Sequence, residues 1–254
     1  MKEKINHLLS QLATEQQFTI LLAVESGSRA WGFASPDSDF DVRFIYLRPL
    51  EYYLSVYPGE DNIDLPIKED LDLVGWDMKK ALFLLGKSNC TLLDWIGSPI
   101  VYHSESGFQS DIKELALSTF QPKPGIYHYL NLAEKTGNIS NPGSEISLKS
   151  LIYCLRSLMA CHWIYQEKTP PPVPFDQLLD FCPYSNAEKQ AIADLVQKKK
   201  QAAESENAPL HPVLAELVKR ELDLHRSRVK SLPSKPGLNT ADIDAFFQKW
   251  VLNE

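Results

Sequence analysis

The first hundred residues carry a hydrophobic pattern that predicts one helix followed by strands. Apolar residues recur at helical spacing between positions 4 and 17, which predicts a short amphipathic helix. Positions 18–24 form a mainly apolar run, as in a buried strand, and the serines and glycine of positions 25–28 mark a turn after it. Positions 39–47 alternate between polar and apolar residues, and positions 71–74 are short and β-compatible. Three strands are therefore expected in this part of the chain.

Helical periodicity appears after the third strand and dominates from position 115 onward. Asp77 precedes an apolar periodic run and is predicted to cap a helix that reaches position 86, and helical character returns at positions 92–96. Further helices are predicted at positions 127–135, 147–166, 187–203 and 212–229 and from position 240. The proline-rich stretch 169–174 cannot be helical and is predicted to be an extended connector. The expected fold class is α+β, with strands near the N-terminus followed by a mainly α-helical bundle.

Composition and charge narrow this picture. The 254 residues are 44% hydrophobic and 23% charged, which is ordinary for a chain with a buried core. The net charge of −7 argues against holding nucleic acid by bulk electrostatics alone, and residues 1–100 hold 9 Lys/Arg against 15 Asp/Glu. The run Lys198-Lys199-Lys200 is expected on a solvated face. The sequence has neither a long apolar run nor a signal peptide, so we expect a cytoplasmic protein with no membrane association.

The candidate chemistry begins with a Gly27-Ser28 turn after the first strand and an Asp39-Phe40-Asp41 motif at the start of the second. A Gly-Ser turn lets backbone N–H groups approach a triphosphate, and the Ser28 hydroxyl can add a hydrogen bond. Aspartates two residues apart on a strand project from one face and can share divalent cations, whereas without a cation they repel each other. The stretch before Asp39 also fits a plain turn, and the strand and glycine turn that precede it favour a catalytic site.

A third carboxylate is expected, because phosphoryl transfer by metal-bound aspartates usually needs one further acid. Asp72 is the candidate because it lies inside an apolar strand, where an ionised side chain needs a partner or a function. Asp70 and Asp77 are the alternatives, and Asp77 already has an explanation as a helix cap. The predicted catalytic and metal-binding set is therefore Asp39, Asp41 and Asp72.

Residues 27–46, which contain both motifs, resemble the signature of the polymerase-beta nucleotidyltransferase superfamily and, more narrowly, its RNA-repair-pathway polymerase-beta family. Residues 75–82, 87–89 and 93–95 resemble later blocks of that family, as do Lys149, Tyr153 and Arg156. The resemblance covers most of residues 20–165. It implies a small mixed β-sheet nucleotidyltransferase core backed by helices, so we expect a catalytic domain over residues 1–110 and a helical domain over residues 111–254.

The same resemblance implies an activity, which is transfer of an NMP from an NTP with Mg²⁺ or Mn²⁺ as cofactor. Carried onto this chain, Gly27 and Ser28 hold phosphate, Asp39 and Asp41 bind metal, and Asp72 matches the expected third acid. Some family members are associated with RNA ligases, which implies an RNA ligase as a partner. The resemblance leaves the NTP and the acceptor open, and the acceptors considered are an RNA end, a protein or a small molecule such as an aminoglycoside.

Two arginines near the motifs are further candidates for nucleotide binding. Arg29 follows the glycine-serine turn, and Arg43 shares a strand face with Asp39 and Asp41, so either can neutralise triphosphate charge. The alternative for Arg43 is a plain ion pair with Asp41. Both interpretations are kept open at this stage.

The helical half raises additional hypotheses. Lys149, Tyr153 and Arg156 fall at i, i+4 and i+7, and form either a stripe that contacts a nucleotide or an ordinary solvated face. Arg156 and His162 lie six apart, which resembles the spacing of the HEPN ribonucleases and would make the helical half a ribonuclease. A catalytically inactive nucleotide or RNA sensor of the same fold is the other alternative. The cysteines and the remaining histidines show no ligand spacing.

Overall fold

The computed structural model describes residues 1–57, 59–68, 70–137, 143–201, 206–233 and 240–252, which divide between two compact units. The sheet unit comprises Met1–Ala30, Asp39–Phe120 and Pro236–Glu254, and the helical unit comprises Trp31–Ser38 and Gln121–Lys235. The boundary falls at residue 120 rather than at residue 110, and the last helix belongs to the sheet unit. The short segment after the glycine-serine motif also belongs to the helical unit, which sequence periodicity does not reveal.

The sheet unit is built on a five-stranded mixed sheet in the order β3-β4-β2-β1-β5. Its strands are β1 (Thr19–Glu25), β2 (Phe40–Leu47), β3 (Asn62–Lys68), β4 (Leu71–Asp77) and β5 (Val101–Ser104). β2 and β4 run parallel, whereas the other neighbouring pairs are antiparallel. The predicted small mixed sheet is therefore confirmed, and the three strands predicted from the sequence are the central ones.

The two edge strands, β3 and β5, escape the sequence pattern. β3 contains Pro66, which lacks an N–H group, and its pairing with β4 shifts register between Leu65 and Lys68. A proline and an irregular register are tolerated at a sheet edge, where one side of the strand needs no partner. β5 spans only Val101–Ser104 and is partly exposed, so it has no continuous apolar run to announce it.

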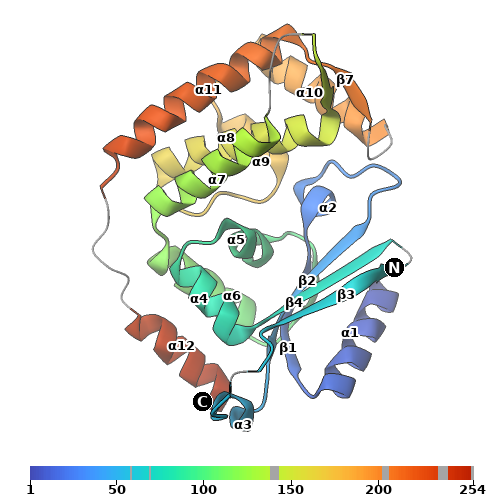
Figure 1. Cartoon of the computed structure of the whole chain (residues 1–254), viewed down its shortest axis with the longest axis vertical. Helices are drawn as coiled ribbons and strands as arrows, with labels where there is room; N and C mark the ends of the chain where they lie inside the picture. The colour runs from blue at the N-terminus through green and yellow to red at the C-terminus, as the bar shows by residue number, and fades with distance from the viewer. Residues whose placement is uncertain (58, 69, 138–142, 202–205, 234–239, 253–254) are drawn as a thin grey trace. The chain divides into compact units, whose positions relative to one another are not determined.

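Helices cover both faces of the sheet (Figure 1). On one face lies α1 (Lys2–Gln16), whose Ile5, Leu9 and Leu12 share a buried cluster with Phe44 and Tyr46 of β2. The helices on the other face are α4 (Met78–Gly86), α5 (Cys90–Gly97) and α6 (Phe108–Thr119). The predicted cap of α4 is confirmed, because the Asp77 carboxylate accepts a hydrogen bond of 2.8 Å from the Lys79 N–H.

The final helix, α12 (Ala241–Leu252), is present as predicted and packs onto the sheet unit. Its Phe247 ring lies 5.1 Å from the ring of Tyr53 in α3 (Leu50–Tyr53), and its Trp250 ring lies 4.9 Å from that of Phe108. These aromatic contacts explain why the helix belongs to this unit.

The helical unit is arranged around α8 (Leu148–Glu167), which packs against four other helices. These are α7 (Pro122–Thr136), α9 (Phe175–Phe181), α10 (Asn186–Gln201) and α11 (Pro212–Ser231). A two-stranded sheet of β6 (Glu145–Ser147) and β7 (Asn207–Pro209) completes the unit. The four long helices and the non-helical connector at 169–174 are as predicted. The pattern does not reveal α9, β6 and β7, which are short.

One prediction about the helical unit is wrong. Lys199, in the middle of a lysine run expected to be solvated, is only 1% exposed, and its Nζ donates to the Ser35 hydroxyl at 2.9 Å. The lysine ties α10 to the segment that precedes β2, and a buried ammonium needs such a polar partner. The four cysteines are buried and free. In the part of the chain that the structure describes, no helix is long and apolar enough to cross a bilayer.

Candidate active site

The first feature of the candidate site is the pairing of Asp41 with Asp72 across the parallel strands β2 and β4. The two residues are direct partners in the strand register, so their side chains leave the same face of the sheet. Arg43 joins them, because its Nη2 lies 3.0 Å from Asp41 Oδ1 and 2.7 Å from Asp72 Oδ2. The side chains of Asp41 and Asp72 are 30% and 23% exposed, so solvent and small ligands reach them.

Arg43 supplies the positive charge that two adjacent carboxylates require. Without it, carboxylates this close repel each other unless a cation lies between them. The Arg43 Nη1 also donates to the backbone carbonyls of Val42 and Asp72, both at 3.1 Å, so the guanidinium is held by four acceptors. The ion pair between Arg43 and Asp41 expected as one alternative is present, and it extends to Asp72.

The glycine-serine motif touches the acids directly. Gly27 has φ 59°, and a Cβ atom added there would lie 2.2 Å from Asp41 Oδ2. The backbone just before the motif is also bonded to β2, because the Ser26 N–H donates a hydrogen bond of 2.8 Å to the Asp41 carbonyl. The motif is the first turn of a five-residue helix, α2 (Gly27–Trp31), rather than an open turn. Only glycine satisfies both the left-handed backbone and the contact with Asp41.

A carboxylate that the sequence interpretation missed supports Asp41 from behind. Glu25, at the end of β1, is 1% exposed, and its Oε1 accepts a hydrogen bond of 2.8 Å from the Asp41 N–H. Its Oε2 accepts from the Tyr102 hydroxyl. Burial raises the pKa of Glu25, and the nearby Asp41 charge acts in the same direction, against the two hydrogen bonds. An acid that ends an otherwise apolar strand was the available signal, but the pattern placed Glu25 in a turn.

Asp39 and Arg29 lie at the entrance to β2. Asp39 precedes the strand, and it is exposed. The Arg29 Nε donates a hydrogen bond of 3.0 Å to the backbone carbonyl of Asp39, and the Arg29 guanidinium stacks 3.7 Å from the centre of the Phe40 ring. Arg29 therefore fixes the backbone that carries the motif. Its predicted role toward a nucleotide stays a prediction, as does metal binding by Asp39.

The two alternatives for the third acid occupy other places. Asp77 lies at the far end of β4, paired with Tyr46, where it caps α4 and accepts from the Tyr53 hydroxyl at 2.9 Å. Burial raises its pKa. Asp70 is exposed in the turn before β4 at φ 61°, and its carbonyl accepts from the Phe40 N–H at 2.7 Å. Of the three acids, Asp72 is the one whose side chain shares a binding partner with Asp41.

Lys149, Tyr153 and Arg156 belong to the helical unit, where Lys149 and Tyr153 are half-buried and Arg156 is buried. The Tyr153 ring packs edge-on at 4.6 Å from the ring of Trp31, and the Arg156 guanidinium lies 4.1 Å from the centre of that same indole. Arg156 is 2% exposed and also donates to the Val173 carbonyl at 3.3 Å. Lys149 lies 5.9 Å from the Tyr153 ring. Their assignment to nucleotide binding stays a prediction.

The arginine and histidine of the HEPN-like spacing have different surroundings. Arg156 packs on Trp31, whereas His162 lies 6.1 Å from the ring of His225, and both residues are almost fully buried. Substrate cannot reach side chains buried in this way without a rearrangement. The described contacts therefore give the ribonuclease hypothesis no support.

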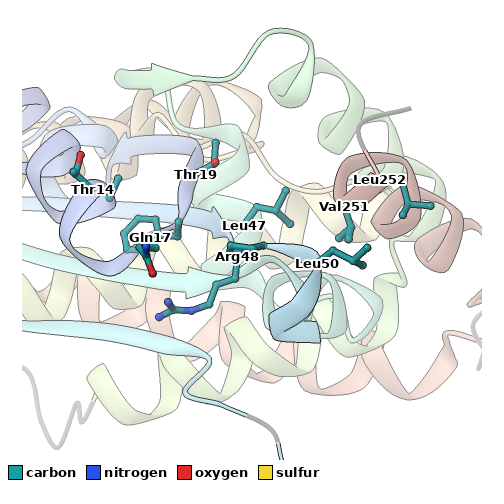
Figure 2. Close-up of a pocket in the computed structure, with 11 residues that line it drawn as sticks. Thr14, Gln17, Thr19, Leu47, Arg48, Leu50, Val251 and Leu252 are labelled. Carbon is teal, nitrogen blue, oxygen red and sulfur yellow. The ribbon is translucent and has the colours of Figure 1, made fainter. Parts of the chain in front are cut away.

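A cavity of about 650 Å³ in the sheet unit lies away from these acids. Thr14, Gln17, Leu47 and Arg48 line it together with Leu252 of the last helix (Figure 2). Leu47 ends β2 and Asp41 is near its beginning, so the cavity is at the opposite end of the strand. The cavity is thus separate from the candidate site.

Comparison with known proteins gives three findings. The RNA repair pathway DNA polymerase beta family matches the chain over residues 1–249. The uncharacterized protein YcgL of Bacillus subtilis (strain 168) is 34% identical over 244 residues, which are 96% of this chain and 94% of that protein. A solved structure of a nucleotidyltransferase-like protein from Exiguobacterium sibiricum 255-15 also matches. The match covers 100% of this chain and 88% of the chain of that protein, with 10% sequence identity and a TM-score of 0.36. The chain belongs to the RNA repair pathway DNA polymerase beta family, as its motifs predicted.

Proposed function

We propose that this protein transfers an NMP from an NTP to an acceptor, with release of pyrophosphate. The observation that carries the proposal is the convergence of Asp41, Asp72 and Gly27 on one face of the sheet. Asp41 and Asp72 share the Arg43 guanidinium, and Asp41 Oδ2 packs against the α-carbon of Gly27. Acids and a glycine bend in contact form a compact site for a nucleotide and its cations. Family membership supports the same activity.

The donor atoms of the site fit Mg²⁺ or Mn²⁺. Asp41 and Asp72 present carboxylate oxygens side by side and partly open to solvent, and Asp39 would complete the set from the entrance of β2. Hard divalent cations prefer such oxygen ligands and keep some water. When bound, the ions stabilise charge on the transferred phosphoryl group and activate the attacking hydroxyl.

The protein's own residues have distinct tasks in this proposal. Gly27 allows the phosphates to approach the backbone, and the Ser28 hydroxyl and the Arg29 guanidinium bind phosphate oxygens. Arg43 keeps Asp41 and Asp72 in place before the nucleotide arrives. Glu25 orients the start of β2 through the Asp41 N–H and acts as a positioning residue.

A sensor that binds a nucleotide without turnover is the second candidate, and one observation favours it. Arg43 already pairs with both Asp41 and Asp72 and offsets one of their two negative charges, which lessens the need for an added ion. In an enzyme the metal binds these same two carboxylates beside Arg43 or in its place. The two candidates therefore differ in whether NTP binding leads to pyrophosphate release.

The acceptor and partner are proposed from the family alone. Membership of an RNA repair pathway family favours an RNA end as the acceptor and an RNA ligase as the partner. The acidic composition argues that the protein holds a short RNA terminus rather than a long duplex.

The test is a screen of the four NTPs, labelled at the α-phosphate, against RNA ends, proteins and aminoglycosides in the presence of Mg²⁺ or Mn²⁺. We expect label to move to one acceptor class, with pyrophosphate released. Asp41→Asn should remove the transfer, whereas Asp64→Asn, a matched change of an exposed acid on β3, should retain it. Full transfer activity in Asp41→Asn would refute the assignment of transferase activity to this site. Nucleotide binding without turnover for every acceptor would favour the sensor hypothesis.

A further inference from the structure

The helical unit contains a second group of potential metal ligands, unrelated to the acids of the sheet. His162 of α8 and Glu221 and His225 of α11 each direct one ligand atom toward the others, and these atoms all lie within 4.8 Å of one another. Glu221 and His225 are four residues apart, so they share one face of their helix. The site therefore joins two helices of the same unit.

All three side chains are buried, with 5%, 3% and 0% exposure for His162, Glu221 and His225. Buried polar atoms are nearly always hydrogen-bonded, because losing water without a replacement is costly. Within the described residues, however, both ring nitrogens of His225, Nδ1 of His162 and Oε2 of Glu221 have no hydrogen-bond partner. The Nε2 of His225 approaches Glu221 Oε2 only to 3.4 Å. Apart from that contact, one ring nitrogen of His162 and one of His225 have no partner among the described residues, which indicates a group that the three side chains bind in common.

The charges around the site suit a divalent cation rather than an anion or a neutral ligand. The Arg220 guanidinium lies 3.1 Å from Glu221 Oε1 and supports the negative charge of the carboxylate. A neutral imidazole, such as that of His162, offers a cation the lone pair of one ring nitrogen. One carboxylate oxygen remains available, since Arg220 contacts only Oε1.

We propose that His162, Glu221 and His225 bind one transition-metal ion of the zinc class, which joins α8 to α11. Two imidazoles and one carboxylate are a known ligand set for Zn²⁺, with a fourth position left to water. Ligand atoms of a tetrahedral zinc site lie about 3.3 Å apart, so binding needs side-chain movements of about 1 Å. Because a buried ion of this kind is taken up together with folding, its role is to hold the two helices together.

Titration of the chelator-treated full-length protein with Co²⁺, followed by visible absorption, tests the proposal. We expect intense d–d bands that saturate near one equivalent and disappear when Zn²⁺ is added. The acids of the sheet do not give this signal, because an all-oxygen site favours six-coordinate geometry with weak bands. The test thus succeeds or fails independently of the transferase proposal. Absence of intense bands would overturn the proposal.

A ligand substitution provides the second arm. His162→Gln should lower Co²⁺ affinity by about 100-fold or more, since even residues behind a ligand can change metal affinity 10- to 100-fold. His7→Gln, a matched change of an exposed histidine on α1, should leave it unchanged. A folded His162→Gln protein with the affinity of the wild type would contradict the assignment. If that variant does not fold, the bands of the unmodified protein decide the matter.

Discussion

The acids of the sheet and the histidine-glutamate group of the helical unit both gather potential metal ligands, but they satisfy those ligands differently. Asp41 and Asp72 are roughly a quarter exposed and already share the Arg43 guanidinium. His162, Glu221 and His225 are buried, and several of their polar atoms have no described partner. A partly exposed site whose two acids share one arginine suits ions that arrive and leave with a substrate. A buried and unsatisfied one suits a resident ion.

The largest effect is expected from adding a side-chain atom at Gly27, where the backbone lies against Asp41. Gly27→Ala places a Cβ at 2.2 Å from Asp41 Oδ2 and forces alanine into φ 59°, so we expect transfer to fall about 100- to 1,000-fold. Gly107→Ala is the matched control, because that residue has φ 81° but nothing within 4 Å of its Cβ. Both variants should lose about 1 kcal/mol of stability from the backbone, and only Gly27→Ala should lose activity. Equal activities would show that the glycine contact is irrelevant to function.

The next comparison separates the two ends of β4. Asp72→Asn should lower transfer about 100-fold while leaving thermal stability near that of the wild type. Asp77→Ala should do the reverse, because it removes the side chain that caps α4 and accepts from Tyr53, at a cost of about 1 kcal/mol. Steady-state rates and thermal melts of both variants measure the two effects. If Asp77→Ala were the inactive variant, the choice of the third acid would be wrong.

How much of this was visible in the sequence depends on how local each feature is. The motif of Gly27, Asp39 and Asp41 lies within fifteen residues and was readable directly. Asp72 lies opposite Asp41 because β2 and β4 pair in parallel, although the unpredicted strand β3 comes between them along the chain. The sequence therefore suggested Asp72 by its residue type, and it could not show the strand register. Glu25 looked like a turn residue because its partner, the Asp41 N–H, lies sixteen positions away.

The helical unit was harder to interpret, because its key contacts connect distant segments. His162 and Glu221 are on separate helices, and no ligand spacing links them along the chain. The four-residue step from Glu221 to His225 was the one local signal, and it is common on solvated helices. Lys199 looked solvated within a lysine run, since nothing near it in the sequence announces the buried Ser35 hydroxyl.

Arg43 offers a way to sharpen the contrast between the two regions. Arg43→Gln leaves Asp41 and Asp72 without their shared cation, so we expect a loss of about 1–2 kcal/mol when divalent ions are chelated. Mg²⁺ should restore most of that stability, because an ion can take over the charge. Thermal melts with chelator and with Mg²⁺ compare the variant with the wild type. A variant whose melting temperature ignores Mg²⁺ would argue that the acids do not bind the ion.

The smallest effect concerns Glu25 and pH. Burial raises its pKa above the ordinary value of 4.5, so its contribution to stability is fully present below that pH and is lost as pH rises through the folded-state pKa. Glu25→Gln keeps hydrogen-bond acceptance toward the Asp41 N–H without ionising. We therefore expect the variant to gain stability relative to the wild type as pH rises above 4.5, in urea melts over a series of pH values. An unchanged difference across that range would show that Glu25 is not held against ionisation.

The most direct test of the central claim is the binding of Mn²⁺ with an NTP, followed by electron paramagnetic resonance of free Mn²⁺, because it needs no knowledge of the acceptor. The wild-type protein should sequester Mn²⁺ when the NTP is present, and Asp41→Asn and Asp72→Asn should each weaken this binding strongly, with Asp64→Asn unchanged. Binding of Mn²⁺ and NTP by both variants as tightly as by the wild type would contradict the account.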